Sequence, residues 1–335
     1  MKFLIAGLGS IGRRHLNNLL ALGEQDILLY RTHKSTIPDD ELSRFLVESD
    51  LAAALAHKPD AVIVSNPTAH HLDVAIPTAK AGCHLLIEKP ISHNWERIEE
   101  LQSAVEESGS QVLVGFQFRF HPGLQRASEL LAEGAIGRSL SVRAHWGEYL
   151  PDWHPWEDYR KSYSARAELG GGVILTLCHP LDYLRWLIGD ASSLWALTAQ
   201  SGQLDLDVED IVEIGLQFEN GVIGSVHLDY LKRPPKHNLE IIGAQGTLCW
   251  DNTDGAVKLY QAEVGKWETI PAPDEFERNH LFLNEMKHFL EIVRGNTQPV
   301  CSLADGLVAL ELALAAHRSS KTGQIQRLEA APNVS

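Results

Sequence analysis

The sequence predicts an α/β protein: a doubly wound parallel sheet first, then an α+β domain with a large, mostly antiparallel open sheet. Up to residue 121, short continuous apolar runs alternate with segments of helical periodicity, which is typical of βαβ units. Beyond residue 121, apolar and polar residues alternate, as in strands with one exposed face. A chain of 335 residues can form two such domains, which we place at 1–121 and 122–335, with the late helices able to pack back on the first.

The elements of the first domain follow from the apolar runs. Between the first two strands, apolar residues at helical spacing predict a helix over 11–22, ending at Gly23. A charged amphipathic helix is expected over 95–107, with Asn94 as its N-cap. Pro77 weakens the helical pattern around it because proline removes a helix hydrogen bond. Strands covered on both faces are expected at residues 3–6, 27–30, 61–64, 85–87 and 112–114.

The second domain shows the pattern of a sheet with hairpins and late helices. Residues 219–221 supply a hairpin turn, and 243–246 form another loop. Two helices are expected near the end of the sequence, over 283–294 and 304–321. Strands are expected at 139–149, 211–218, 221–230, 239–242 and 247–251.

Composition excludes several classes of partner. The chain has 29 basic and 44 acidic residues and a net charge of −15, which disfavours nucleic acid and anionic membranes. Its four cysteines are scattered and form no CxxC pair, so neither a disulfide framework nor a structural zinc site is expected. No apolar run approaches the roughly 18 residues of a membrane span. We therefore expect a cytoplasmic protein whose partners are small molecules.

The motif Gly7-x-Gly9-x-x-Gly12 follows the first expected strand and opens the first expected helix, the context required for a Rossmann dinucleotide site. The first glycine permits a tight turn, the second lets a pyrophosphate approach the backbone, and the third allows close helix–sheet packing. Ser10 and Ile11 begin the helix, where free N–H groups would face the phosphates. The alternative is a merely structural turn.

The loop after the second strand indicates which dinucleotide would bind. An acidic residue there would bond the ribose of NAD, but the loop contains no acid. Arg31 and Lys34 could pair with a 2′-phosphate, and Thr32 could donate a hydrogen bond to it. We therefore favour NADP, with NAD possible. The alternative is a solvated basic turn.

Glu88-Lys89-Pro90 ends the strand at 85–87, on the side where open α/β sheets bind ligands. A free lysine has a pKa of about 10.4, but partial burial beside another cation could lower it enough for proton exchange near neutrality. Pro90 restricts the backbone of Lys89 and helps to aim its side chain. The alternative is a surface lysine before a turn.

A second cluster follows a triple glycine at 170–172, where the missing side chains would let a backbone or a cofactor approach. His179 and Asp182 are three apart on one helical face, so the carboxylate could orient the imidazole, and Thr176 is the nearest polar neighbour. Pro180 predicts a kink beside His179. The alternative is a histidine in an apolar core.

Between the two domains, residues 149–161 interleave aromatic and polar side chains with prolines. Trp153 and Tyr159 suit the C–H faces of a sugar, and His154 and Arg160 could bond hydroxyl or carboxylate groups. Equally, the segment could be an interface loop packed against a second subunit.

Gln117 and Arg119 follow the strand at 112–114. They are expected to line the edge of the same ligand cleft as Lys89, although Arg119 fits a domain-interface ion pair equally well. None of the 16 histidines forms an HxH or HExxH pattern, so we expect no metal site.

Taken together, these motifs resemble the glucose-fructose oxidoreductase / inositol dehydrogenase (Gfo/Idh/MocA) family over nearly the whole chain. No single motif is decisive, but their order and spacing make a joint match. Besides the glycine motif and Glu88-Lys89-Pro90, the resemblance rests on Asn66-Pro67-Thr68-x-x-His71, Ala81-Gly82-x-His84, Gly115-Phe116, Arg119-Phe120, the glycine-led helix with His179, His288-Phe289-x-x-x-Val293-Arg294-Gly295 and Ser320-x-Thr322-Gly323.

The resemblance implies a nicotinamide-dependent oxidation or reduction of a sugar, cyclitol or related polyol. It also implies a Rossmann domain, and an open sheet that forms a homodimer or homotetramer. In that pattern Lys89 and His179 look like the proton-transfer and substrate-orienting pair. The residues that look like cofactor contacts are Asn66, Pro67, His71 and Glu88.

One position departs from the family pattern. Many members carry an aspartate four residues before the histidine, where this chain has Leu175. A Lys/Asp/His triad therefore cannot be carried over whole. The leading hypothesis is an NAD(P)-dependent sugar or polyol oxidoreductase, and the alternative is a non-catalytic dinucleotide sensor on the same fold.

Overall fold

The computed structural model of this chain describes residues 1–32 and 42–328. Two compact units make up the chain. The first contains residues 1–117, 168–170 and 278–307, and the second contains 118–167, 171–277 and the chain from 308 onward.

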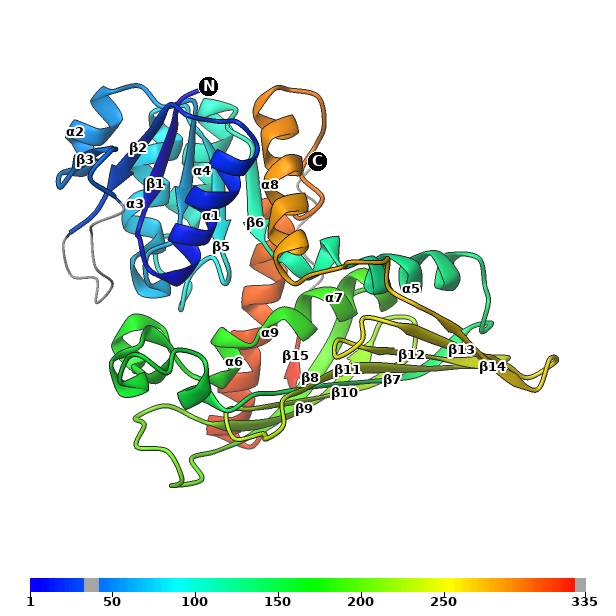
Figure 1. The fold of residues 1–335 in the computed structure, drawn as a ribbon. Helices are drawn as coiled ribbons and strands as arrows, with labels where there is room; N and C mark the ends of the chain where they lie inside the picture. Colours follow the sequence, from blue (N-terminus) through cyan, green and yellow to red (C-terminus); the bar gives the residue numbers. More distant parts are fainter. Residues whose placement is uncertain (33–41, 329–335) are drawn as a thin grey trace. The chain divides into compact units, whose positions relative to one another are not determined.

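The first unit is built on a six-stranded parallel sheet in the order β3-β2-β1-β4-β5-β6 (Figure 1). Three strands, β1, β4 and β6, are buried along their whole length, which explains why they are continuous apolar runs in the sequence. The expectation of a doubly wound parallel sheet is confirmed. The strands are β1 (Phe3–Ala6), β2 (Ile27–Tyr30), β3 (Leu46–Glu48), β4 (Ala61–Val64), β5 (His84–Glu88) and β6 (Val112–Gly115).

Helices of the first unit pack in pairs beside the sheet, α1 with α8 and α3 with α4 (Figure 1). Helix α3 runs through Pro77. The expected cap of α4 is wrong: the helix begins at Ile98, and Asn94 instead accepts a hydrogen bond of 2.9 Å from the Glu96 N–H in the preceding turn. The helices are α1 (Ser10–Ala21), α2 (Leu51–Ala56), α3 (His71–Lys80), α4 (Ile98–Ser108) and α8 (Asn279–Val293).

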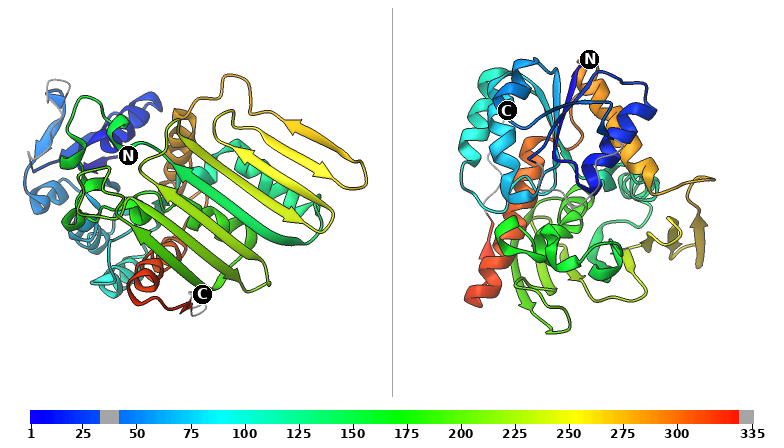
Figure 2. Two further views of the ribbon diagram at one scale, coloured as in Figure 1. Left: turned by 90° about the horizontal axis from the view of Figure 1, so that it is seen from below. Right: turned by 60° about the vertical axis from the view of Figure 1, so that its left-hand side comes forward.

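The second unit contains a nine-stranded sheet in the order β14-β13-β12-β11-β7-β10-β9-β8-β15, seen face-on in Figure 2. Its strands pair antiparallel except β7 with β10, so the expected mostly antiparallel sheet is confirmed. The strands are β7 (Ser139–Gly147), β8 (Ala191–Ala199), β9 (Ile211–Phe218), β10 (Ile223–Asp229), β11 (Lys236–Gly243), β12 (Gly246–Asp251), β13 (Val257–Gln261), β14 (Lys266–Ile270) and β15 (Gln326–Arg327).

The two faces of this sheet differ. On β7, Val142, Ala144 and Trp146 are buried, whereas Arg143 and His145 point to the other face and are partly or fully exposed. Helices α5 (Pro122–Ala132), α6 (Val173–Thr176) and α7 (His179–Ile188) pack against strands of the sheet, on the side where the ring of Trp146 meets that of His179. The opposite face is open within the described part of this unit.

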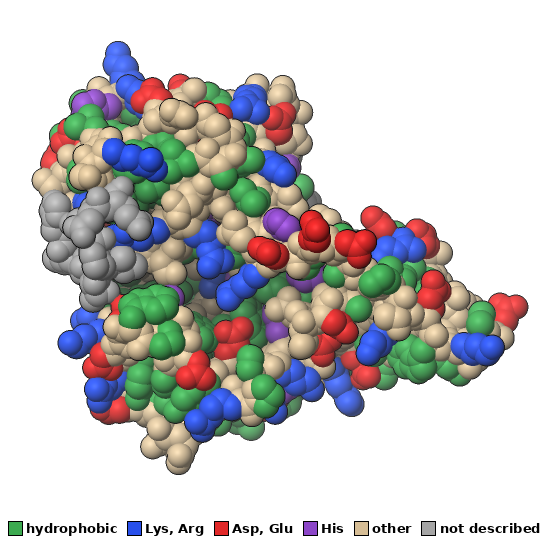
Figure 3. All heavy atoms as spheres, in the orientation of Figure 1, with side chains coloured by type: hydrophobic (Ala, Val, Ile, Leu, Met, Phe, Trp, Pro, Cys, Tyr) green, Lys and Arg blue, Asp and Glu red, His purple; other side chains and the backbone are tan. Residues whose placement is uncertain are grey.

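Helix α9 (Leu303–Thr322) is the longest helix described, and its later part bonds to β8 through Ser319, whose Oγ lies 2.9 Å from the Ala196 N–H. Among the described residues, no helix combines the length and apolar character needed to cross a membrane. On the face seen in Figure 3, acidic and basic side chains are interspersed and form no single basic patch.

Candidate active site

The glycine motif forms the turn between β1 and α1. Gly7 has a φ of +94°, and a Cβ atom there would lie 2.5 Å from the backbone nitrogen of Asn66. A Cβ at Gly12 would lie 2.0 Å from the Gly7 carbonyl oxygen, whereas one at Gly9 would meet nothing within 4 Å. Gly7 and Gly12 are therefore required by packing, and Gly9 faces open space.

This open space lies at the start of α1, whose N-terminus is uncapped. Its N-cap, Gly9, has no side chain to bond the first N–H groups, and the first turn contains no acidic residue. Free N–H groups and the positive end of the helix dipole favour an anion. The residues present thus fit the pyrophosphate of a dinucleotide, with Ser10 and Ile11 supplying backbone N–H groups.

The end of β2 carries the residues expected to choose the dinucleotide. Arg31 is buried, and its backbone N–H donates to the Glu48 carbonyl at 3.1 Å. Thr32 is exposed. Lys34 lies outside the described residues. The structure therefore describes only two of the three residues predicted for the 2′-phosphate.

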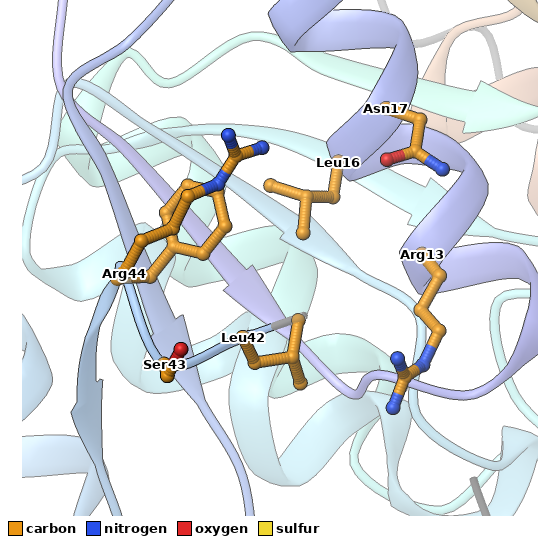
Figure 4. Close-up of a pocket in the computed structure, with 7 residues that line it drawn as sticks. Arg13, Leu16, Asn17, Leu42, Ser43 and Arg44 are labelled. Carbon is orange, nitrogen blue, oxygen red and sulfur yellow. The ribbon is translucent and has the colours of Figure 1, made fainter. Parts of the chain in front are cut away.

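Near these residues is a cavity of about 380 Å³ between α1 and the segment 42–45. Arg13 and Asn17 come from α1 and Arg44 from the facing segment (Figure 4). Two guanidinium groups in one cavity give it the charge of an anion site. Sequence reasoning missed Arg13 and Arg44 because neither lies in a recognised motif. The other lining residues are Leu16, Leu42, Ser43 and Phe45.

The loops after β4 and β5 are joined by His71. Its ring nitrogens lie 2.9 Å from the carbonyl oxygens of Asn66 and Pro90, and burial lowers the pKa of the imidazole. His71 therefore holds the two loops together, and its predicted contact with a cofactor stays a prediction. Asn66 Oδ1 is buried and, within the described chain, has no hydrogen-bond partner. A ligand could donate a hydrogen bond to that oxygen, and the cofactor contacts predicted for Asn66 and Pro67 stay predictions.

Glu88 belongs to a buried cluster with His15 and Glu285. His15 Nε2 lies 2.8 Å from Glu88 Oε1. Burial alone would raise the pKa of Glu88, but the hydrogen bond and charge of His15, together with the charge of Lys89, outweigh burial and lower it. Burial, and then the charge of Glu88, raises the pKa of Glu285 well above its usual range. Glu88 is thus the ionised member, and its bond to His15 fixes the strand end that precedes Lys89.

Lys89 is partly exposed and follows β5 directly, joined to Pro90 by a cis peptide bond. Its backbone N–H bonds Glu88 Oε2 at 3.3 Å. Gln117 follows the neighbouring strand β6 and is buried. Because β1, β4, β5 and β6 are consecutive in the parallel sheet, the structure brings the glycine turn, Asn66, Lys89 and Gln117 to one edge of it.

His179 is the first residue of α7 in the second unit and is only 1% exposed. Its ring lies 5.0 Å from that of Phe118 and 5.3 Å from that of Trp146. Where a kink was expected from Pro180, the helix is interrupted: α6 ends at Thr176 and α7 begins at His179. An aromatic wall therefore holds the imidazole at a helix start.

Arg119 and Asp182 form a buried ion pair within the second unit. Arg119 donates from Nε to Oδ2 at 3.0 Å and from Nη2 to Oδ1 at 2.7 Å, and the side chains are 7% and 2% exposed. Such a two-pronged pair is geometrically specific. Asp182 is thus engaged by Arg119, and the predicted roles of both residues toward a substrate remain predictions.

The glycine-led segment is packed by the chain itself. A Cβ at Gly171 would lie 2.4 Å from the Tyr163 carbonyl oxygen, and one at Gly172 would lie 2.5 Å from Glu209 Oε1. Thr176 is buried, and the nearby Tyr230 hydroxyl donates to the Ser164 carbonyl at 3.3 Å. The close approach at Gly171 is therefore made by this chain's own backbone.

Glu209 is a titratable residue that sequence reasoning missed. Its Oε1 accepts a hydrogen bond of 3.1 Å from the Ile174 N–H in α6. Burial raises the pKa of Glu209 to about 7. Glu209 is one of several acids in the loop before β9, and nothing in the sequence distinguishes it, so only the packing of α6 reveals it.

The aromatic segment is largely engaged with itself and its neighbours. The ring of Trp153 meets that of Tyr230 edge-on at 5.6 Å. Arg160 donates to Asp158 at 2.8 and 2.9 Å on the surface, and the Tyr159 hydroxyl accepts a bond of 3.4 Å from the Asp205 N–H. The ring of His154 lies 5.2 Å from that of the exposed Trp156. To bind a ligand, the Arg160 guanidinium would have to give up its hydrogen bonds to Asp158.

The predicted residues therefore divide between the units. The first unit contains the glycine turn, Arg31, Asn66, Pro67, His71, Glu88, Lys89 and Gln117. The second contains Arg119, Trp153, His154, Tyr159, Arg160, Thr176, His179 and Asp182. Convergence of Lys89 and His179 stays a prediction.

Comparison with known proteins extends this picture. Residues 1–116 match the description "Oxidoreductase family, NAD-binding Rossmann fold", and residues 124–249 match "GFO/IDH/MocA C-terminal domain". The chain is 29% identical over 276 residues to 1,5-anhydro-D-fructose reductase of Ensifer adhaerens, covering 81% of this chain and 80% of that protein. It is 26% identical over 352 residues to myo-inositol 2-dehydrogenase of Thermotoga maritima, covering 98% and 99% of the two chains.

Among solved structures, the fold is similar to that of a levoglucosan dehydrogenase in complex with NADH and levoglucosan. The TM-score is 0.88 at 19% sequence identity, covering 98% of this chain and 100% of that one. The family matches together span most of the sequence. The chain therefore belongs to the GFO/IDH/MocA family of oxidoreductases and carries its NAD-binding Rossmann domain.

Proposed function

We propose that this protein transfers a hydride between a nicotinamide dinucleotide and a hydroxyl-bearing carbon of a sugar, cyclitol or related polyol. The observation that carries the proposal is the edge of the parallel sheet. The uncapped start of α1, the unbonded Oδ1 of Asn66 and the side chain of Lys89 follow the consecutive strands β1, β4 and β5. A dinucleotide site and a proton-exchanging group thus share one edge.

The dinucleotide would supply or accept the hydride. Lys89 would take the hydroxyl proton on its Nζ in the oxidative direction and return it in the reductive one. Neighbouring residues support this role, because the bond between Glu88 and His15 fixes the strand end and His71 fixes the loop after Pro90. His179 would orient the substrate oxygen or share its proton, with Leu175 in the place of the aspartate common in the family.

NADP is the proposed form of the dinucleotide. Arg31 and Thr32 stand where an acidic residue would select NAD, and the nearby cavity adds the guanidinium groups of Arg13 and Arg44. Fluorescence titration would therefore show tighter binding of NADPH than of NADH. Equal or tighter binding of NADH would refute the proposed preference and leave the hydride chemistry intact.

The substrate class is proposed from the relatives. These are named for an anhydrofructose, an inositol and levoglucosan, all compounds rich in hydroxyl groups. Gln117 and Arg119, together with the segment that carries Trp153, His154, Tyr159 and Arg160, would select among them. Aromatic faces and charged hydrogen-bonding groups suit polyols.

We also propose that the open face of the second unit joins copies of this chain into a homodimer or homotetramer. Leu197 and Ile223 on that face are 63% and 65% exposed. A cytoplasmic location is proposed on the acidic balance of the chain and on four cysteines that are free thiols. Light scattering on the purified protein would measure the oligomeric mass, and a monomer would contradict the assembly.

The test of the proposed reaction is Lys89→Ala. We expect turnover on a responsive polyol to fall by about 10²- to 10⁴-fold, the usual contribution of a general acid–base group. NADPH binding, followed by fluorescence, should persist. The matched control is Lys80→Ala, because Lys80 pairs with Glu100 on the surface of α3. Unchanged turnover in Lys89→Ala would remove Lys89 from the mechanism.

One observation favours a second function, a non-catalytic dinucleotide sensor: the absence of the family aspartate at Leu175. A panel of polyols, hydroxy acids and ketoses, assayed by absorbance of the reduced dinucleotide, separates the two. Tight NADPH binding by the wild-type protein without turnover on any of them would support the sensor.

A further inference from the structure

Three potential metal ligands meet on the open face of the second unit's sheet. His145 on β7 and His227 on β10 are directly opposite each other in the parallel register, with ring centroids 4.6 Å apart. Asp229 lies two residues beyond His227 and therefore on the same face. One donor atom from each residue lies within 4.8 Å of the other two. Figure 2 shows β7 and β10 as neighbours in the middle of the sheet.

The carboxylate of Asp229 is held with one oxygen directed at this cluster. Its Oδ1 accepts a hydrogen bond of 2.8 Å from the Leu231 N–H. Its Oδ2 lies 3.1 Å from His227 Nε2 and 3.6 Å from His145 Nε2. Gly147 on β7 lies opposite Asp229 and leaves room for its carboxylate. A Cβ at Gly147 would lie only 2.1 Å from Oδ2. Oδ2 is therefore fixed between the two imidazoles, with a hydrogen bond to His227.

An outer carboxylate orients His227. Glu213 on β9 is directly opposite His227, and its Oε1 lies 2.5 Å from His227 Nδ1. His227 Nε2 donates to Asp229 Oδ2 at 3.1 Å in this structure, and a metal ion that displaced this proton would find the Nε2 lone pair, with Nδ1 still donating to Glu213. Histidines that bind metals commonly donate their other ring N–H to a carboxylate in this way.

The second imidazole also presents a lone nitrogen. His145 Nε2 is buried, yet among the described residues it has no hydrogen-bond partner. Its distance of 3.6 Å from Asp229 Oδ2 exceeds that of a hydrogen bond. A buried nitrogen without a partner costs stability, whereas a bound cation would satisfy it.

The spacing fits a tetrahedral ion. With metal–nitrogen and metal–oxygen distances of about 2.0–2.2 Å, two donors on a tetrahedron are about 3.4 Å apart. The two nitrogen–oxygen distances, 3.1 and 3.6 Å, lie on either side of that value. Two imidazoles and one carboxylate suit zinc and neighbouring divalent transition metals.

We propose that His145 Nε2, His227 Nε2 and Asp229 Oδ2 bind one divalent transition-metal ion of the zinc class, with water in the fourth position. The ion would join the central strands β7 and β10 on the face opposite the buried side chains of β7, and no part of the proposed hydride transfer depends on it. The sequence expectation of no metal rested on histidine patterns within one segment and did not consider this set, whose members come from two strands.

The test is metal binding by the full-length protein after removal of metals with a chelator. We expect equilibrium dialysis against Zn²⁺ to give one ion per chain, and Co²⁺ to give the visible absorption of a tetrahedral site. His145→Asn and Asp229→Asn should abolish both signals. Glu213→Gln should weaken Zn²⁺ binding by about 10- to 100-fold, the usual effect of losing an outer carboxylate. The matched control is His57→Gln, because His57 pairs with Glu48 (2.8 Å) in the first unit and belongs to no described three-ligand cluster.

Two outcomes would overturn the proposal. One is the absence of stoichiometric Zn²⁺ binding by the wild-type protein, which would make the cluster an ion-pair network. The other is loss of binding in Glu285→Gln but not in His145→Asn, which would move the ion to the other described cluster, His15, Glu88 and Glu285. Circular dichroism of each variant identifies any that fails to fold. His145 and Glu213 are partly exposed, so variants at these positions keep the test available.

Discussion

The two units build their candidate sites by different means. In the first unit the site is made of backbone: the turn at Gly7, the uncapped start of α1, and strand ends held by His71 and Glu88. In the second unit it is made of side chains from distant segments, such as Arg119 with Asp182 and His179 against Phe118. Sites built from backbone require particular residues at fixed spacing, so they leave motifs in a sequence. Sites built from side-chain pairs leave less: Arg119 and Asp182 lie in recognised segments, but nothing in the sequence shows that they pair.

The largest effect that tests this difference is expected in the second unit. Asp182→Asn leaves the Arg119 guanidinium buried beside a neutral group and should lower the free energy of unfolding by about 3–5 kcal/mol. The measurement is denaturant unfolding followed by circular dichroism. The matched control is Asp158→Asn, whose partner Arg160 is on the surface and whose loss should leave stability nearly unchanged.

A double variant tests whether the lost stability comes from the unpaired charge of Arg119. Replacing both partners with apolar residues, Arg119→Met with Asp182→Leu, removes the unpaired charge and should recover most of the stability lost in Asp182→Asn. If Asp182→Asn alone is as stable as wild type, the second unit does not depend on this pair and the contrast between the units fails.

The same contrast explains what could be predicted from the sequence. Strands β1, β4 and β6 were predicted because strands buried on both faces are unbroken apolar runs. Strand β8 was missed because its exposed residues Trp195 and Leu197 are as apolar as its buried ones, so the sequence shows no alternation of polar and apolar residues. Strand β14 is exposed nearly throughout and carries no hydrophobic signal.

For the candidate sites, the glycine turn and Lys89 lie in motifs whose spacing is set by local backbone geometry. The pKa of Glu209, by contrast, is raised only when the folded chain buries it beside α6, and His145 meets His227 only when β7 pairs with β10. The cap at Asn94 was wrong because an Asx-type bond to Glu96 competes with helix capping. Sequence motifs therefore predict turns and strand ends, whereas contacts between distant segments become visible only in the folded structure.

A smaller effect is expected at Glu209. Its pKa is raised from an ordinary value of 4.5 to about 7, so the folded protein binds this proton more tightly than the unfolded chain does. The stabilisation is complete below pH 4.5 and is lost as the pH rises through 7, a change of about 3 kcal/mol. Glu209→Gln, which stays neutral, should lose this pH dependence and be more stable than wild type at pH 8.

The measurement for Glu209 is unfolding by urea at pH 5, 6, 7 and 8 for wild type and variant. Glu219→Gln, an exposed acid in a hairpin turn, is the control and should keep the wild-type profile. Parallel profiles for wild type and Glu209→Gln would show that the environment of this carboxyl does not shift its titration, and would contradict the expected pH dependence.

The smallest effect on stability is expected in the glycine turn, where two substitutions of the same size should differ. Gly12→Ala places a Cβ 2.0 Å from the Gly7 carbonyl oxygen and should cost about 1–3 kcal/mol, because the helix must move away from the strand. Gly9→Ala meets nothing within 4 Å, so the unfolding free energy should change little. Because Gly9 faces the space where a pyrophosphate would lie, the methyl group of Gly9→Ala should instead weaken NADPH binding.

Unfolding curves and fluorescence titration of both variants separate the effect on stability from the effect on binding. Equal loss of stability in both would mean that the turn is only a packing element, and the backbone-built dinucleotide site would have to be abandoned.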